Sequence, residues 1–212
     1  MTYLDDLLAG ADKYFKINLF NTVSGIRSVW MIGTADSRGR KNLGLFNSVV
    51  HIGANPPLLG VVFRPESVRR HTLENIRSTG FFTFNSINQA ILDLAHKTSL
   101  KYSDQEDEFD ILGFKPFYFP NHTTPAVEDS PLKILLKRKE EHLIEANKTV
   151  FVVGEIINLA VDNSSAVDEN GCIRHDLLNH AAISGLNDYY CCQFLKSKWD
   201  QKKGSLPKNG NS

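Results

Sequence analysis

The sequence predicts a mainly β protein with added helices, an α+β fold built around an antiparallel barrel. Several short apolar segments bounded by turn residues are typical of strands, and only a few short helical patterns lie between them. Strands and helices in regular alternation would instead indicate a doubly wound sheet. No internal repeat is visible, and the pattern therefore favours a barrel.

Four strands are expected in the first half of the chain. Their predicted ranges are 28–34, 42–52, 58–63 and 81–85. A turn at 36–39 follows the first strand, and a break at 55–57, which contains two prolines, ends the second. The third strand is continuously apolar, which is typical of a strand that is buried on both faces.

Three short helices are expected beside these strands. At the chain start, Thr2 and Asp5 have the spacing of a capping box that opens a helix. A second helix is predicted at 72–79. A third is predicted within 88–96, where apolar residues recur at helical spacing.

The second half of the chain is less regular. Its clearest strand is 149–161, and Asn170-Gly171 predicts a hairpin turn. The strongly acidic segment 103–110 is expected to form a surface loop, and 113–125, rich in Pro and Phe, an irregular segment. The polar residues 196–212 predict a disordered tail.

Length and charge set limits on the class of protein. The 212 residues are 42% hydrophobic and 23% charged, and we expect a single domain over residues 1–195. The 24 Lys and Arg residues balance the 24 Asp and Glu residues, so the formal net charge is zero. A nucleic-acid-binding protein would show a basic excess, and no nucleic-acid partner is expected. Any basic site must therefore be local.

The sequence predicts a cytoplasmic protein without a membrane partner. No apolar run approaches the roughly 20 residues that cross a bilayer, and the first residues lack the features of a secretion signal. The three cysteines, Cys172, Cys191 and Cys192, make a poor disulfide framework and favour a reducing compartment. They are expected to be small buried residues, with a redox role for the adjacent pair as the alternative.

A group of cations lies at the end of a predicted helix where acidic residues are usually found. The 72–79 helix has Thr72 as its expected N-cap, and three cations come just before it: Arg69, Arg70 and His71. Cations at this end repel the partial positive charge of the unpaired N–H groups, unless an anion lies between them. A phosphate would meet backbone donors, a hydroxyl group and guanidinium groups together. The alternative is that both arginines point into water.

Other familiar motifs are missing. No glycine-rich phosphate loop follows a strand, and no serine or cysteine lies in a Gly-x-Ser-x-Gly turn. His175 and His180 are five residues apart, which is poor spacing for a shared metal on a helix, and no metal site is expected. An anion site without a clear catalytic side chain suits a protein whose chemistry belongs to a bound cofactor.

Two long stretches of the sequence resemble the core of the flavin reductase-like, FMN-binding split-barrel family. They are 42–64, with its Asn-Pro-Pro between two strands, and 71–85, which joins the helix to an aromatic strand. Shorter matches follow in the same order at 96–109, 153–156 and 185–189. The resemblance covers roughly residues 20–190, and its specificity comes from the ordered set of motifs.

This resemblance implies an FMN-binding split β-barrel and an FMN-dependent oxidoreductase. The activity it favours is that of an NAD(P)H-dependent flavin reductase, with FMN as the cofactor and NADH or NADPH as a possible co-substrate. The alternatives are an FMN-binding electron carrier and a non-enzymatic flavin-binding module. In the family FMN lies at a subunit interface, so a homodimer is expected.

For the phosphate group of FMN, the physical argument and the resemblance indicate the same place, the start of the 72–79 helix. The residues expected to bind it are Arg64, Ser67, Arg70, His71 and Thr72. The residues expected along the isoalloxazine edge are Phe46, Asn47, Ser48, Val49 and Val50. Hydrogen-bond donors along this edge would stabilise the negative charge of the reduced ring.

Three smaller groups complete the predicted site. Asn85 and Ser86 are expected to contact the ribityl chain or the ring, although Asn85 alternatively only caps a strand. The residues expected to close the site are Ser99, Lys101 and Tyr102, with a surface charge as the alternative for Lys101. His51 and His96 are candidates for shaping a nicotinamide pocket, with a structural role as the alternative. No catalytic side chain is assigned, because hydride transfer needs no general acid or base.

Overall fold

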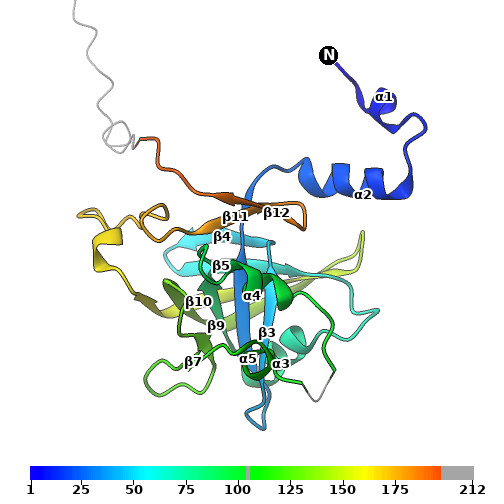
Figure 1. The fold of residues 1–212 in the computed structure, drawn as a ribbon. Coiled ribbons are helices and arrows are strands. Elements are labelled where there is room, and N and C mark those ends of the chain that lie inside the picture. Colours follow the sequence, from blue (N-terminus) through cyan, green and yellow to red (C-terminus); the bar gives the residue numbers. More distant parts are fainter. Residues whose placement is uncertain (104–105, 197–212) are drawn as a thin grey trace, which may run out of the picture.

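A computed structural model of the chain describes residues 1–103 and 106–196. The predicted disordered tail, apart from Lys196, lies outside the described residues. The described part is mainly β with added helices, which confirms the predicted fold class (Figure 1). The largest element is a seven-stranded antiparallel sheet in the order β3-β2-β6-β9-β10-β5-β4.

The two longest strands of this sheet, β9 and β10, lie side by side near its middle. Its strands are β2 (Trp30–Ala35), β3 (Lys41–Phe46), β4 (Val49–Ala54), β5 (Pro57–Phe63), β6 (Phe81–Ser86), β9 (Leu132–Ile144) and β10 (Thr149–Val161). A three-stranded sheet consists of β1 (Arg27–Ser28), β11 (Ala181–Ser184) and β12 (Asp188–Cys191), and a two-stranded one of β7 (Pro116–Phe117) and β8 (Ala126–Val127).

The helices lie outside the sheets. They are α1 (Leu4–Leu8), α2 (Lys13–Thr22), α3 (His71–Thr79), α4 (Leu92–Lys97), α5 (Glu108–Leu112) and the 3₁₀ turn Ser164–Ala166. Figure 1 shows α3 and α5 at one end of the barrel and the β11–β12 hairpin at the other. The N-terminal helices α1 and α2 extend away from the barrel.

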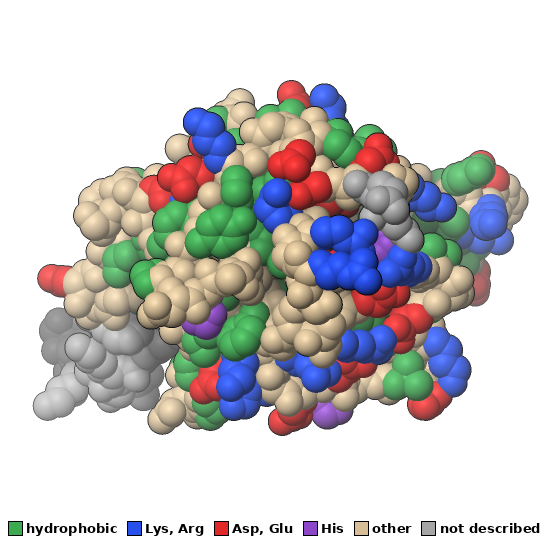
Figure 2. Space-filling model, turned by 90° about the horizontal axis from the view of Figure 1, so that it is seen from below, with side chains coloured by type: hydrophobic (Ala, Val, Ile, Leu, Met, Phe, Trp, Pro, Cys, Tyr) green, Lys and Arg blue, Asp and Glu red, His purple; other side chains and the backbone are tan. Residues whose placement is uncertain are grey.

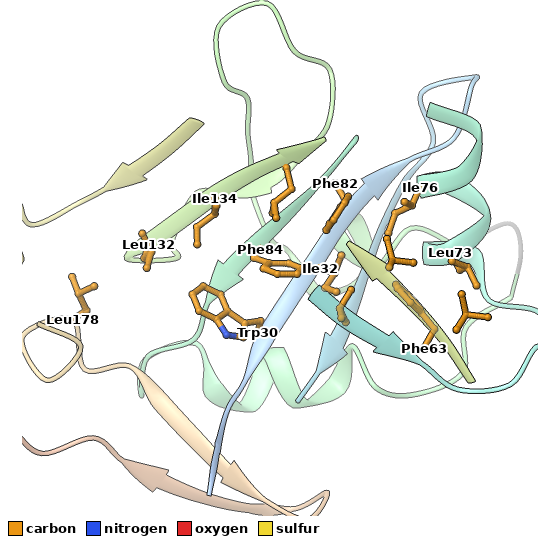
Figure 3. Packing of buried hydrophobic residues seen from close by; sticks show 14 of the residues in the cluster. Trp30, Ile32, Phe63, Leu73, Ile76, Phe82, Phe84, Leu132, Ile134 and Leu178 are labelled. Atoms are coloured by element: carbon orange, nitrogen blue, oxygen red, sulfur yellow. The ribbon is translucent and has the colours of Figure 1, made fainter. Parts of the chain in front are cut away.

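The main core lies between the strands and α3. Leu73 and Ile76 of α3 are fully buried against the aromatic strand β6, whose Phe82 and Phe84 rings meet edge to face at 5.4 Å (Figure 3). Burial of such side chains contributes about 1.5–3 kcal/mol each. This packing fixes the position of α3, and therefore of its first turn.

One predicted strand and one predicted turn differ in extent from the elements of the structure. The expected strand 42–52 is two strands, β3 and β4, because the chain turns at Asn47-Ser48 and continues beside β5. The Asn170-Gly171 turn is present, but it closes only an isolated bridge between Val167 and Ile173. The predicted hairpin turn is therefore present, although no strand flanks it in the described chain.

The predicted helix starts also shift. α3 begins at His71 with Arg70 as its N-cap, so the assignment of Thr72 as the cap is wrong. At the chain start, α1 has Tyr3 as its N-cap, and the Tyr3 N–H group donates to Asp6 rather than Thr2 pairing with Asp5. Within 88–96 only the end is helical. The Asn88 carboxamide oxygen accepts from the Ala90 and Ile91 N–H groups and forms a turn before α4.

Two expectations about surface and burial are wrong. The acidic segment 103–110 ends in helix α5, and Glu108 is buried rather than solvated. All three cysteines are exposed and unpaired, so they are not the buried side chains that the sequence predicted. Their position, on a turn and at the end of β12, leaves their thiols near solvent.

Candidate functional site

The start of α3 offers backbone donors and a guanidinium group together. Arg70 is the N-cap and provides no side-chain cap to the first turn, while its carbonyl oxygen accepts from the Glu74 N–H group at 3.0 Å. The Arg70 Nε atom donates to the Pro65 carbonyl oxygen at 3.3 Å. Its terminal Nη atoms have no acceptor among the described residues. This arrangement suits an anion.

The other predicted phosphate-binding residues surround this turn unequally. Arg64 and Ser67 are exposed on the loop that leads to α3, and His71 is half-buried in its first turn. Arg69 is different, because its guanidinium group forms an ion pair with Glu74 at 2.9 Å on the helix surface. The structure thus separates two neighbouring arginines that the sequence treats alike, and Arg70 is the better candidate.

Strand β3 is connected to the same helix start through buried side chains. The Asn42 amide donates to the Thr72 hydroxyl oxygen at 3.0 Å and to the Thr34 hydroxyl oxygen at 3.4 Å. Thr72 is 8% exposed, so its hydroxyl group lies against the protein while its backbone opens the helix. Gly44 packs closely here, because a Cβ atom on it would lie 3.4 Å from the Thr72 hydroxyl oxygen.

The predicted isoalloxazine edge follows directly from β3. The Phe46 ring packs edge to face on the Phe63 ring of β5 at 5.1 Å between centroids. The Ser48 hydroxyl group donates to the Val62 carbonyl oxygen at 2.7 Å, and the Val62 N–H group donates back to the Ser48 carbonyl oxygen at 3.3 Å. The link between β3 and β4 is therefore held to β5, the strand that leads into the loop predicted to bind phosphate.

The 46–50 segment contacts the β11–β12 hairpin at Asn47, and its last residues lie on the exposed edge strand β4. The Asn47 amide donates to the Gly185 carbonyl oxygen at 2.7 Å, which joins the segment to the β11–β12 hairpin. Val49 is half-buried, whereas Val50 is exposed on β4, the last strand of the large sheet. His51 is also exposed on this strand. The segment approaches the start of α3 at its other end, because a Cβ atom on Gly44 would lie 3.1 Å from the Phe46 ring and 3.4 Å from the Thr72 hydroxyl oxygen.

Glu108, which was expected in a surface loop, is buried and hydrogen-bonded to strand β3. The buried Glu108 carboxylate accepts from the Leu43 N–H group at 3.0 Å. Burial raises the Glu108 pKa above its ordinary value, while the bond from Leu43 and the positive charge of a protonated His71 lower it. The sequence signal that could identify it is the Asp107 N-cap, which starts α5 and turns the next side chain inward.

Asn85 and Ser86 have their polar atoms occupied within the barrel. Both are fully buried. The Asn85 amide donates to the Met31 carbonyl oxygen at 3.2 Å, and its oxygen accepts from the Val127 N–H group at 2.8 Å. The Ser86 hydroxyl oxygen accepts from the Leu132 N–H group at 2.9 Å. These two side chains therefore hold neighbouring parts of the barrel together.

The segment predicted to close the site forms mainly local hydrogen bonds. The Ser99 hydroxyl group donates to the His96 carbonyl oxygen at 2.7 Å, and the Tyr102 hydroxyl group donates to the Lys97 carbonyl oxygen at 3.1 Å. Lys101 is exposed. The two bonds hold the segment after α4 to the end of that helix.

His96 has a partner outside its own segment. Its Nδ1 atom lies 2.7 Å from the Tyr189 hydroxyl oxygen on β12, and the two rings meet edge to face at 5.7 Å. Burial raises the Tyr189 pKa, so the phenol stays protonated near neutral pH. This pair holds α4 against the β11–β12 hairpin, which is the structural alternative considered for His96.

The end of the protein that carries α3 and α5 has a mixed charge. Figure 2 views this end and shows Lys and Arg side chains gathered near its centre, with acidic side chains among them. Helix α3 also carries paired charges, since the Arg77 guanidinium group lies 2.5 Å from the carboxylates of both Glu66 and Glu141. A local basic site within a neutral chain is consistent with the sequence analysis.

The described residues contain neither a metal centre nor a membrane-spanning helix. No group of three metal-ligating side chains occurs in residues 1–103 and 106–196. Within the same residues, no helix is long and apolar enough to cross a bilayer. A surface pocket lined by Asn88, Gln89, Ala90 and Asn179 contains none of the predicted site residues.

Comparison with known families identifies the class of protein that this fold and site define. The family model described as "Flavin reductase like domain" matches residues 24–180. The chain therefore belongs to the flavin reductase-like family, as the sequence resemblance predicted. A comparison with curated proteins found no match.

Solved structures with the same fold include one of substantial sequence identity. A protein from Shewanella frigidimarina NCIMB 400, assigned as a flavin reductase with a split barrel domain, is 38% identical with a TM-score of 0.86. The match covers 93% of this chain and 98% of that chain. It confirms the predicted split barrel.

Two more distant structures share the fold alone. The 2-nitrobenzoate 2-nitroreductase of Pseudomonas fluorescens is 19% identical with a TM-score of 0.77, and the match covers 100% of this chain and 99% of that chain. An FMN-binding protein from Thermus thermophilus is 18% identical with a TM-score of 0.65, and the match covers 81% of this chain and 91% of that chain.

Proposed function

We propose that the protein is an FMN-dependent oxidoreductase, most simply an NAD(P)H-dependent flavin reductase. Family membership supports a flavin-related oxidoreductase role. The observation that carries the finer proposal is the start of α3, where a helix without a side-chain cap meets the Arg70 guanidinium group. This anion site adjoins the 46–50 segment, as a cofactor with a phosphate at one end and a flat ring at the other requires.

The residues present fit FMN. The backbone N–H groups at the start of α3 and the Nη atoms of Arg70 would bind the phosphate, with Arg64, Ser67 and His71 around them. Thr72 would hold the first turn in place through its bond with Asn42. Riboflavin lacks the phosphate, so this site would select FMN over riboflavin.

The 46–50 segment would provide the ring site. Its two hydrogen bonds, from Ser48 to Val62 and from Asn47 to Gly185, hold the backbone in place before a ligand arrives. The chemistry that bound FMN supplies is two-electron transfer, from a reduced nicotinamide to an acceptor. The chain would orient the ring, exclude water from one face and leave the other accessible to the nicotinamide.

We also propose a homodimer in the cytoplasm, in which the flavin lies at the subunit interface. The exposed edge strand β4, directly after the ring segment, supports this arrangement because an apolar edge is normally covered. A two-fold interface would use the same patch from both chains.

Two measurements test the proposed function. The purified protein should be yellow, and denaturation should release FMN rather than FAD. Under anaerobic conditions, NADH or NADPH should bleach the visible absorbance of the bound flavin. If neither nucleotide bleaches it, the reductase proposal fails, and an electron carrier reduced by a partner protein becomes the better account. A protein that does not bind FMN would refute both.

A further inference from the structure

The N-terminal segment carries large apolar side chains that lie outside the barrel. Neither α1 nor α2 buries any of its residues. Figure 1 shows both helices extended away from the sheets, with only the end of α2 close to the β11–β12 hairpin. We refer to residues 1–26 as the N-terminal arm. It lies almost entirely before the family match, which begins at residue 24.

Helix α2 is apolar on several sides. The exposed fractions are 76% for Tyr14, 45% for Phe15, 40% for Ile17 and 54% for Phe20. A helix with so many large apolar side chains is normally covered by other protein. The described part of a single chain does not cover it. The arm therefore carries large apolar side chains that are typical of an interface, although its own chain leaves them exposed.

The base of the arm is fixed to the barrel. The Arg27 Nη2 atom donates to the Asn21 carbonyl oxygen at 3.0 Å. The Thr22 methyl group packs so closely on Gly185 that a Cβ atom there would lie 3.0 Å from it, and the positive φ of 61° at this position also favours glycine. These contacts set the direction in which α2 leaves the barrel, so the arm does not fold back over its own sheet.

The base of the arm is also connected to the predicted ring segment. Gly185 packs against Thr22 on one side, and its carbonyl oxygen accepts from Asn47 on the other. Directly after Asn47, strand β4 exposes Val50 and Ile52, at 46% and 42%. The exposed apolar side chains of β4 therefore lie close to the contacts that join α2 to the barrel.

The area of the arm fits a dimer interface. A buried aromatic side chain covers about 150–250 Å². At the exposed fractions above, the three aromatic residues of α2 would bury roughly 260–440 Å² per arm. The surface beneath them would bury a similar area, so each arm contact would cover roughly 500–900 Å² in total, about half of a standard interface. Two arms in a two-fold dimer would then supply a complete one.

We propose that each N-terminal arm lies on a second copy of this chain and covers β4 and the ring segment of that copy. Each flavin site would then be completed by an arm from the partner subunit. This inference rests on the proposed function, because it adds a wall to the same flavin site. It commits to a second copy because the arm is anchored beside the matching surface but points away from its own.

An arm variant tests the contact. Phe15→Asp with Phe20→Asp places charges on the apolar side of α2 without touching the barrel. Lys16→Gln with Asn18→Asp is the matched control, since it makes the net charge more negative by the same two units at polar, exposed positions of the same helix. We expect sedimentation velocity to give a dimer for the parent and the control and a monomer for the arm variant. We also expect FMN affinity to fall at least tenfold in the arm variant only.

A mixing experiment tests whether the arm acts on the partner. The arm variant has an intact phosphate site, and full-length Arg70→Ala has an intact arm. We expect each alone to bind FMN weakly and their mixture to show tight FMN binding that neither shows alone. A mixture that equals the sum of its parts would overturn the proposal, as would a monomeric parent that binds FMN as tightly as the arm variant does.

Two further outcomes separate this inference from the proposed function. If the parent is a dimer that the arm variant dissociates, but neither binds FMN, then the arm contact is supported and the flavin role fails. If the parent is a monomer whose arm binds vesicles of neutral phospholipid, and the arm variant loses this binding, then a membrane surface covers the arm and the dimer proposal is overturned.

Discussion

The Asn42 amide donates to the Thr72 hydroxyl oxygen at 3.0 Å, although the two residues are 30 positions apart in the sequence. Asn42 lies on β3, which continues into the predicted ring segment, and Thr72 lies in the first turn of α3. Because both side chains are buried, this bond sets the spacing between the two halves of the proposed FMN site.

Asn42→Ala should therefore weaken both the fold and the cofactor site. The substitution leaves the buried Thr72 hydroxyl oxygen without this donor, while Thr34 keeps the Asn75 amide as its donor, and we expect the free energy of unfolding to fall by about 1–3 kcal/mol. We expect FMN affinity to fall as well, since the first turn of α3 loses its support. Chemical denaturation and FMN titration measure the two effects.

Asn75→Ala is the matched control for this prediction. The Asn75 amide donates to the Thr34 hydroxyl oxygen at 3.2 Å but makes no bond to Thr72. It should lower stability modestly and leave FMN affinity unchanged. Equal loss of FMN affinity in the two variants would show that the bond to Thr72 has no particular role in the site.

Gly154→Ala should destabilise the barrel. A Cβ atom at this position would lie 2.5 Å from the ring of Phe82 and 3.1 Å from Leu136, and both side chains are fully buried. Such overpacking typically costs about 1–3 kcal/mol. Gly53→Ala is the control, because its Cβ atom would meet only the Pro56 carbonyl oxygen at 3.4 Å. Thermal unfolding of the two variants should differ clearly, and equal midpoints would contradict the packing described.

Stability should fall as the pH is lowered from about 6.5 to 4, where His180 gains a proton. Burial lowers the His180 pKa to about 4 from the model-compound value of 6.5. Because the folded state disfavours the charged form, this contribution is complete above pH 6.5 and is lost as the pH falls through 4. At about 1.4 kcal/mol per pKa unit, the whole effect is about 3 kcal/mol.

The geometry around His180 explains the direction of this change. Its Nε2–H group donates to the Val29 carbonyl oxygen at 3.2 Å, and its Nδ1 atom lies 2.9 Å from Nδ1 of His175. A second proton on the His180 ring would face the proton that His175 donates. His180→Gln should flatten the pH dependence of the unfolding free energy, whatever its effect at pH 7. A slope equal to that of the parent would refute the assignment.

The elements that could be predicted from the sequence are those with a clear run of apolar or β-branched residues between turn residues. β10 lies at 149–161, as expected, because its β-branched residues and bounding turns are clear. Strand β9 was not predicted, because its second half, from Lys137 to Ile144, is charged and exposed, and the strand owes its length to pairing with β10. Helix α2 was also missed, since its apolar residues do not form a single stripe.

In the proposed site too, features with a local sequence signal could be predicted, and features that depend on the folded chain could not. The start of α3 could be located from a run of cations before a helix, because that signal lies within a few residues. The pairing of Arg69 with Glu74 and the burial of Glu108 could not, since both depend on where side chains point in the folded chain. The hydrogen-bond partners of Asn85 could not be predicted for a related reason. Its position at the end of a strand is visible in the sequence, but its three partners are not.

The most direct test of the proposed phosphate site is a comparison of FMN and riboflavin binding. Arg70→Ala removes a charge-assisted contact worth about 1.5–3 kcal/mol, or roughly ten- to a hundredfold in affinity. Arg69→Ala is the control, because this arginine forms an ion pair with Glu74. Titration should show much weaker FMN binding in Arg70→Ala only, with riboflavin weak in all three proteins. Equal FMN affinity in the parent and Arg70→Ala, with riboflavin binding as well as FMN, would contradict the account.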